Sequence, residues 1–339
     1  MRITTNAILR NYKSNLATSL SNLDLARTKV MTGRNFNSTA EDPASALRAA
    51  TLERKYMRNK DYLNTVKDAQ SFQDAQEDAS MQISDIALTL TKRYGLEALN
   101  GTNKSSETRQ TYADAWRGAQ KSMLLSLNAT YEDNYVFAGS DSKEPPFSMG
   151  KNAAGEETLF FRGIDVNSTD PDDIAKLEGF SKETVYVDLG FGLSIDGNGT
   201  VEPSSAFNTS LPGINVIGYG QDQNGTAKNM VVLAGQIADA LEAEPFDEAE
   251  YTKLLNAFEG GRNKVLEQVT VLGTQTEFLT ATKERLESTD IRLSTQIDNI
   301  VNVDMAGAIT DFSWAQYAYN AALKVGTNIL SPSFIDFMN

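Results

Sequence analysis

Apolar side chains recur every seven residues along the C-terminal flank of the chain. A sustained repeat of this spacing predicts a helix that is buried along one seam. The positions four residues further on are mixed, because Arg262, Lys283 and Asp290 interrupt Val269 and Ile297. The stripe is therefore narrow, and such a helix needs long helical partners beside it. The column, which we call the core seam, follows Phe258 and consists of Val265, Leu272, Leu279, Leu286, Leu293 and Ile300.

The N-terminal flank has two similar columns. They predict long helices that could lie beside the core seam. The first column is Leu9, Leu16, Leu23 and Val30, and the second combines Phe72, Ala79 and Ile86 with Gln76, Ile83 and Leu90.

Signals for the start of a helix indicate that this flank contains more than one helix. In Asp42-Pro43, the Asp can accept hydrogen bonds from the first turn and the Pro fits the first helical position. The pair predicts a helix that begins there. A third helix is predicted from Ser105 or Ser106 to about Asn128, with one apolar face formed by Tyr112, Trp116, Ala119, Met123 and Leu127.

The middle of the chain has a different character. Five of the eight prolines lie between Pro145 and Pro212, and 13 of the 23 glycines lie between Gly139 and Gly225. An alternating run, 185–195, precedes a hairpin-type turn at 196–199. The patterns together predict a mainly α fold with a β-rich insert. The expected parts are terminal helices at 1–40 and 305–339, a helical core at 41–146 and 227–304, and the insert at 147–226.

The charge of the chain and its lack of two residue types exclude several function classes. The net charge of −14 opposes binding to a phosphate backbone, so we expect no nucleic-acid partner. No apolar stretch has the length of a membrane span or of a signal peptide, so we expect no membrane partner. The chain has no Cys and no His, which rules out disulfides, Cys/His zinc sites and imidazole-based triads.

The remaining candidate sites have structural explanations. Gly218-Tyr-Gly220 imitates part of a dinucleotide fingerprint, but Gln223 stands where the third glycine belongs; a strand-to-helix connection is the preferred interpretation. The loop from Asp196 lacks the glycine and the glutamate of a calcium loop. Carboxylate pairs such as Glu242 and Glu244 are interpreted as solvated surface. We therefore predict no catalytic, cofactor-binding or metal-binding residues.

Three segments resemble proteins of the flagellin superfamily. Residues 31–46, which contain Gly33 and Asp42-Pro43, are similar to the turn between the first two long helices of that family. The Asp-Pro form resembles its hook-associated protein 3 branch. Phe137-Ala138-Gly139, before Pro146-Phe147, resembles that branch's passage from helical core to outer domain. Residues 304–338 resemble the C-terminal helix and its short apolar tail.

The resemblance implies a fold, a location and partners. The fold would be a flagellin-like D0/D1 core of coiled-coil-like helices from both termini, with a small β-rich D2 domain. The chain would be secreted through the flagellar type III export apparatus, with an export chaperone, and would be a structural protein of the hook–filament junction. The implied partners are flagellin, hook-associated protein 1 and copies of the chain in a ring.

We expect the two ends of the chain to pack together in an inner layer that becomes ordered on assembly, because narrow stripes on isolated helices do not offset chain entropy. The insert is expected to face solvent, and its loss to spare assembly. The residues predicted to pack are Ile3, Ile8, Leu9, Leu16, Leu20, Leu23, Ile309, Phe312, Leu323, Ile329 and Leu330.

Three alternatives stay open. A filament flagellin belongs to the same structural class but would polymerise alone. A secreted carboxylate-dependent hydrolase could be carried on a flagellin-like frame, with its site in the insert. The segment from Arg93 to Asn100 corresponds to a region that host Toll-like receptors recognise in flagellins, although Tyr94-Gly95 departs from the usual pattern there.

Overall fold

The computed structural model describes residues 2–99, 105–152 and 155–330, with the side chains of 2–5 and 328–330 left out. The chain divides into two compact units, which are described separately. Unit 1 consists of Met1–Lys60 and Glu287–Asn339, and unit 2 is Asp61–Leu286. The apolar tail from Ser331 to Met338 therefore lies outside the described residues.

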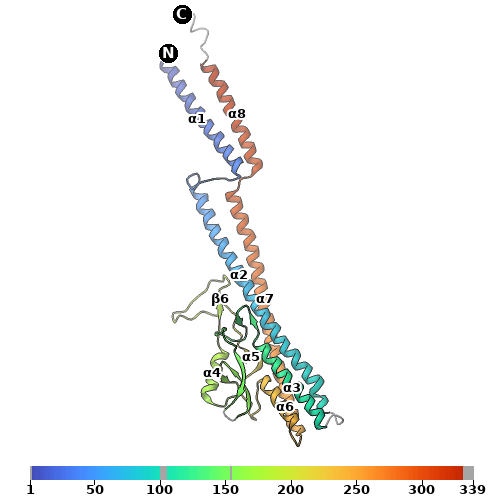
Figure 1. Cartoon of the computed structure of the whole chain (residues 1–339). Helices are drawn as coiled ribbons and strands as arrows, with labels where there is room; N and C mark the ends of the chain where they lie inside the picture. The colour runs from blue at the N-terminus through green and yellow to red at the C-terminus, as the bar shows by residue number, and fades with distance from the viewer. Residues whose placement is uncertain (1, 100–104, 153–154, 331–339) are drawn as a thin grey trace. The chain divides into compact units, whose positions relative to one another are not determined.

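Four long helices contain much of the chain (Figure 1). They are α1 (Arg2–Thr32), α2 (Pro43–Thr89), α7 (Glu248–Val301) and α8 (Met305–Leu330). In unit 1, α1 and α8 lie side by side and run in opposite directions. The helices α2 and α7 each have residues in both units. The helix α2 begins at Pro43, as the Asp-Pro pair predicts.

Unit 2 has an extensive apolar core. The helices α3 (Ser106–Leu127) and α6 (Met230–Glu242) pack against each other there, with short helical turns at Leu90–Gly95 and Glu97–Leu99. The fully buried Trp116 contacts Phe258 of α7 edge to face, with ring centroids 4.9 Å apart. Ser105 begins α3, because its hydroxyl accepts a hydrogen bond from the Thr108 amide. The predicted bounds of the third helix are correct.

Small antiparallel sheets occupy the middle of the chain, so the fold is mainly α with a β-rich insert. Phe147 pairs with Phe161, which also pairs with Ile164 across a two-residue turn. The sheets are β1 (Thr130–Tyr131) with β2 (Asn134–Tyr135), β3 (Phe147–Lys151) with β4 (Glu157–Phe161) and β5 (Ile164–Asp165), and β6 (Tyr186–Val187) with β7 (Phe207–Asn208). Two short helices, α4 (Pro171–Ser181) and α5 (Gly213–Ile217), complete the insert.

Two local predictions are wrong. The alternating run 185–195 contains only the two-residue strand β6, because Gly190 and Gly192 have φ of +81° and +88° and interrupt extended backbone. Two of its apolar side chains pack onto helices: Leu189 is buried in a cluster with residues of α2 and α7, and Phe191 stacks on Phe278 of α7 with centroids 5.6 Å apart. Residues 214–217 form the helix α5 and not a strand, so Gly218 ends a helix. The turn predicted at 196–199 is present, closed by an Ile195–Val201 bridge.

The insert shares its core with the helices. Phe147, Leu159 and Phe161 belong to the same buried cluster as Trp116 and Phe258. Deletion of 147–226 would therefore uncover apolar surface of the helical core, which argues against the expectation that its loss spares assembly. The division of the chain into terminal, core and insert parts stays a prediction.

Replacing Trp116 should test the core of unit 2. We expect Trp116→Ala to lower the free energy of unfolding by about 3 to 5 kcal/mol, because it removes a large buried ring. Urea unfolding followed by circular dichroism measures this. Leu125→Ala on the same helix is the control, since Leu125 is 75% exposed, and it should change stability by less than about 0.5 kcal/mol. Equal losses in the two variants would contradict the packing described.

Candidate assembly surfaces

The antiparallel pair of α1 and α8 makes close contact at one polar position. The Tyr12 hydroxyl donates a hydrogen bond to the Ala322 carbonyl over 3.2 Å. Gly326, one turn further along α8, lies directly against the Tyr12 ring, and a Cβ atom at this position would overlap the hydroxyl. A tyrosine and a glycine thus fix how these two helices meet.

The side chains predicted to pack between the chain ends differ in burial. Half-buried positions are Leu9, Leu16, Leu23 and Phe312. Exposed positions are Ile8, Leu20, Ile309 and Leu323. The side chains of Ile3, Ile329 and Leu330 lie outside the described residues. The α1–α8 pair brings one half of the described set together and leaves the other half in solvent.

Unit 1 buries very little apolar surface. Among its described residues, the only fully buried apolar side chains are Ala49 and Ala308. Unit 1 exposes large apolar side chains that the sequence analysis did not single out, including Met31 and the edge-to-face pair Trp314 and Tyr317. Trp314 and Tyr317 are spaced i, i+3 on a long helix with a polar face, and this spacing is the sequence signal that could have identified them. Such exposure on two long helices marks a surface for other chains.

The core seam follows the same division. Val265, Leu272, Leu279 and Leu286 are buried in unit 2. Leu293 and Ile300, which belong to unit 1, are only half-buried. The change in burial coincides with the boundary after Leu286, although the seven-residue spacing continues unchanged.

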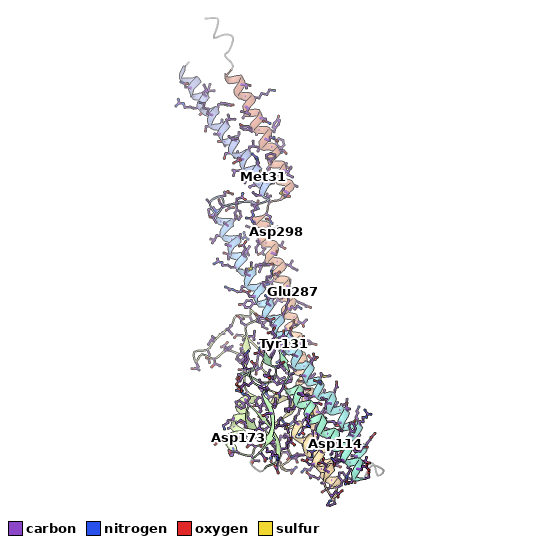
Figure 2. The ribbon with its side chains drawn as sticks, in the orientation of Figure 1. Met31, Asp114, Tyr131, Asp173, Glu287 and Asp298 are labelled. Carbon is purple, nitrogen blue, oxygen red and sulfur yellow. The ribbon has the colours of Figure 1, made fainter. Side chains whose placement is uncertain are left out.

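Hydrogen bonds join the two helix ends of unit 1 at residues 33–35 and 300–303, which we call the clasp. The Val303 amide donates to the Gly33 carbonyl over 2.9 Å, and the Asn35 amide donates to the Val301 carbonyl over 2.8 Å. The Asn35 side-chain amide donates to the carbonyls of Ile300 (3.0 Å) and Asn302 (2.9 Å). Figure 2 marks Met31 and Asp298 on the two helices that the clasp joins.

Aspartate caps flank the clasp. The Ser45 amide donates to Asp42 Oδ1 over 3.0 Å at the start of α2, and this backbone hydrogen bond lowers the pKa of Asp42. At the start of α8 the Ala306 amide donates to Asp304 Oδ1 over 3.1 Å. Gly33, Asp42 and Pro43 of the sequence signature thus occupy helix ends, where they fix the path of the chain.

The second signature, Phe137-Ala138-Gly139, lies where the chain passes out of the helical core. Phe137 and Ala138 are fully buried, and the Phe137 carbonyl accepts from the Gly213 amide over 2.9 Å. Gly139 has φ of +77°, and a Cβ atom there would lie 2.5 Å from Glu183 Oε2. Only glycine fits this turn and this contact.

Glu183 holds that turn in place through hydrogen bonds, and no local pattern in the sequence predicted this role. Its carboxylate accepts hydrogen bonds from the Ser140 amide and hydroxyl, both at 2.9 Å, and from Arg162 Nη1 at 2.8 Å. Burial raises the pKa of Glu183, but the hydrogen bonds from Ser140 and Arg162 outweigh it and leave the pKa below its usual value. The Arg162 guanidinium also lies 4.3 Å from the centre of the Phe180 ring.

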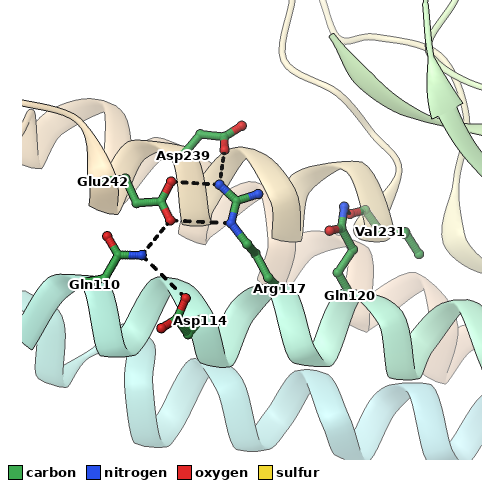
Figure 3. A network of polar contacts seen from close by, with 7 residues as sticks. All are labelled: Gln110, Asp114, Arg117, Gln120, Val231, Asp239 and Glu242. Carbon is green, nitrogen blue, oxygen red and sulfur yellow. Dashed lines mark hydrogen bonds and ion pairs between the residues drawn. The ribbon is translucent and has the colours of Figure 1, made fainter.

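A polar network joins α3 to α6 (Figure 3). Arg117 forms ion pairs of 2.8 Å with both Asp239 and Glu242, and Gln110 donates to Glu242 over 2.9 Å. The hydrogen bond from Arg117 lowers the pKa of Glu242. Glu242 is exposed, in agreement with its interpretation as solvated surface, but it ends α6 and its ion pair with Arg117 connects two helices. The network is an ion-pair cluster between packed helices, a structural arrangement.

Two further properties of the described residues concern metal sites and membrane spans. Within 2–99, 105–152 and 155–330, no three Asp or Glu side chains group as metal ligands would. In the same ranges no helix combines the length and the apolar character needed to cross a lipid bilayer.

Comparisons with known proteins find similarity to proteins of the bacterial flagellum. Residues 3–142 match the model of the bacterial flagellin N-terminal helical region. The chain is 23% identical to flagellar hook-associated protein 3 of Escherichia coli K12 over 306 residues, covering 89% of this chain and 88% of that protein. It is 21% identical to the protein of that name from Salmonella typhimurium, covering 97% of each. The crystal structure of Bacillus cereus FlgL has a similar fold, with a TM-score of 0.51, 12% identity, and coverage of 73% of this chain and 99% of that chain.

Glu183→Gln should reveal the role of the Gly139 turn through pH. Above the ordinary glutamate pKa of about 4.3, the hydrogen bonds of the charged carboxylate contribute about 1 to 3 kcal/mol to stability. Because the native pKa is lowered, this contribution disappears as the pH falls through that lower value. Urea unfolding should therefore show Glu183→Gln as destabilised at pH 7, with a deficit that shrinks steadily as the pH is lowered below the ordinary glutamate pKa. Glu202→Gln, on an exposed loop, is the control, and a Glu183→Gln deficit that does not change with pH would contradict the account.

Proposed function

We propose that the chain is a member of the flagellin family and a structural subunit at the hook–filament junction of the bacterial flagellum. Its terminal helices would link hook-associated protein 1 to flagellin. The observation that carries this proposal is the exposed apolar surface of unit 1, whose fully buried apolar side chains, within the described residues, are two alanines. Two long helices that bury so little apolar surface are not expected in a protein that functions as an isolated monomer.

The energetics of unit 1 support assembly as the source of order. Ordering the backbone costs about 1 to 2 kcal/mol per residue, while burial of a large apolar side chain contributes about 1.5 to 3 kcal/mol. The α1–α8 pair leaves Ile8, Leu20, Ile309 and Leu323 exposed, so this contribution is largely unrealised in one chain. Neighbouring helices would supply it. Residues 1–40 and 305–339 then form the layer that orders on assembly.

The partners follow from this position. Flagellin would contact one side, hook-associated protein 1 the other, and further copies of the chain would complete a ring. The chain would reach this place through the flagellar type III export apparatus, accompanied by an export chaperone. Export of a chain whose ends are not yet ordered is compatible with a narrow channel. The central helices 41–146 and 227–304 would form the rigid body of each subunit, and 147–226 its outer part.

The function we propose is structural and not enzymatic. The carboxylates with lowered pKa values have structural partners: Glu183 holds the Gly139 turn and Glu242 pairs with Arg117 across two helices. Structural hydrogen bonds and ion pairs of this kind shift the pKa values of carboxylates that have no role in catalysis.

Removal of the chain from cells should test the proposal. If the chain is the junction subunit, cells without it should build hooks, form no filaments and release flagellin into the medium, because flagellin has no foundation. Electron microscopy and immunoblots of the medium measure this, with restoration by the intact gene as the control. Filaments of normal length in the deletion strain would refute the proposal.

Asn35→Asp should weaken assembly by disturbing the clasp. The substitution places carboxylate oxygens against the Ile300 and Asn302 carbonyls in place of a donor. Loss of two hydrogen bonds, each about 0.5 to 1.5 kcal/mol, should reduce the filament-bearing fraction of cells several-fold. Asn37→Asp in the same turn is the matched control, since the Asn37 side chain is exposed. Equal phenotypes would argue against a specific role for Asn35.

A further inference from the structure

Charge is distributed unevenly along the chain. Residues 1–60 hold 11 Lys or Arg and 4 Asp or Glu, whereas residues 61–286 hold 18 and 35. The first segment is therefore basic although the whole chain is acidic. The contrast is visible within α2, whose N-terminal part belongs to unit 1 and whose C-terminal part belongs to unit 2.

The N-terminal part of α2 carries a face that we call the basic face. Leu47, Arg54 and Arg58 follow one another at helical spacing, and Met57 lies beside them. All four side chains are exposed. In the described part of the chain, Arg54 and Arg58 belong to no ion pair. Two exposed apolar side chains are thus accompanied by two cations that have no anionic partner among the described residues.

The part of α2 in unit 2 carries a matching surface, the acidic face. Asp74, Asp78, Met81 and Asp85 are spaced by four, three and four residues and are all exposed. None of these three carboxylates forms an ion pair with a described residue of the chain. The acidic face thus reproduces the plan of the basic face, an apolar side chain among like charges, with the opposite sign.

A neighbouring helix also carries an exposed apolar side chain. Ser126 of α3 donates a hydrogen bond of 2.8 Å to Gln82 of α2, and the preceding residue, Leu125, is 75% exposed. Leu125 is therefore an exposed apolar side chain on the helix that lies beside α2 in unit 2.

We propose that the basic face of one copy docks on the acidic face of the next copy in the ring. This inference rests on the proposed function, because it requires copies side by side in one assembly. Opposite charges around apolar centres favour encounter and exclude like pairs. The two faces are different surfaces of the same chain, so each copy offers one to each neighbour. Such a heterologous contact generates rings or helices rather than closed pairs.

Charge reversal tests this contact. One variant combines Arg54→Glu with Arg58→Glu, and a second combines Asp74→Arg with Asp78→Arg. Each variant should reduce the amount of chain recovered with sheared flagella about 2- to 30-fold, the range expected for two exposed ion pairs. A chain that carries all four substitutions regains complementarity between copies and should recover to within about 2-fold of the parent. This rescue excludes misfolding as the cause of the single defects. Lys143→Glu with Lys151→Glu, two exposed lysines, makes the same change in net charge as the arginine reversal and should have no effect.

The outcomes separate this inference from the proposed function. If the parent chain itself is absent from sheared flagella, the proposed function fails and the inference fails with it. If the parent is present but the four-substitution chain stays defective, the faces do not bind each other, and flagellin or hook-associated protein 1 is the partner. If neither charge reversal has an effect, the two faces are not an interface.

Cross-linking gives a second test, because the chain contains no cysteine of its own. A chain with Arg58→Cys and Asp78→Cys, treated with a bis-maleimide in sheared flagella, should yield species of two and more copies of this chain. Chains with only one of the two substitutions should yield at most traces of them. Cross-links to a different protein, or none at all from incorporated chain, would overturn the inference.

Discussion

The structure depends on a limit to what two helices can bury. Each long helix of unit 1 has a narrow apolar stripe, and one partner covers only part of it. In the described residues of unit 1, Tyr12 against Gly326 and the half-buried leucines of α1 account for the contact, while Trp314, Tyr317 and Met31 remain exposed. The hydrophobic effect is proportional to the area removed from water, so the unrealised part is available only to other chains. Unit 1 is in this sense an incomplete core.

The polar contacts have a different role: they define the positions of helix ends and turns before that core is complete. The clasp and the caps at Asp42 and Asp304 fix where α1, α2, α7 and α8 begin and end. The Arg117 network and the Glu183 turn keep unit 2 in one arrangement. Binding to a surface whose elements are already in place costs less conformational entropy than binding to a loose one. Unit 2, with Trp116 and Phe258 at its centre, provides the stable body on which this depends.

The sequence predicted the features that arise from local periodicity and local capping. The start of α2 follows from Asp42-Pro43, and the bounds of α3 follow from Ser105 and one apolar face. Features that arise from distant contacts escaped prediction. Glu183 lies 43 residues from Ser140, and nothing near it in sequence reveals that pairing. The run 185–195 has the alternation of a strand, but positive-φ glycines and the stack of Phe191 on Phe278 prevail. The two faces of α2 were also missed, because helical spacing gathers charges that form no run in the sequence.

Hydrogen exchange measured on the monomer and on assembled flagella would test most directly whether unit 1 completes its core only through its neighbours. The account predicts that amides of α1 and α8 exchange rapidly in the monomer and become protected on assembly, while amides of α3 and α6 are protected in both. Strong protection of α1 and α8 in the dilute monomer would contradict it.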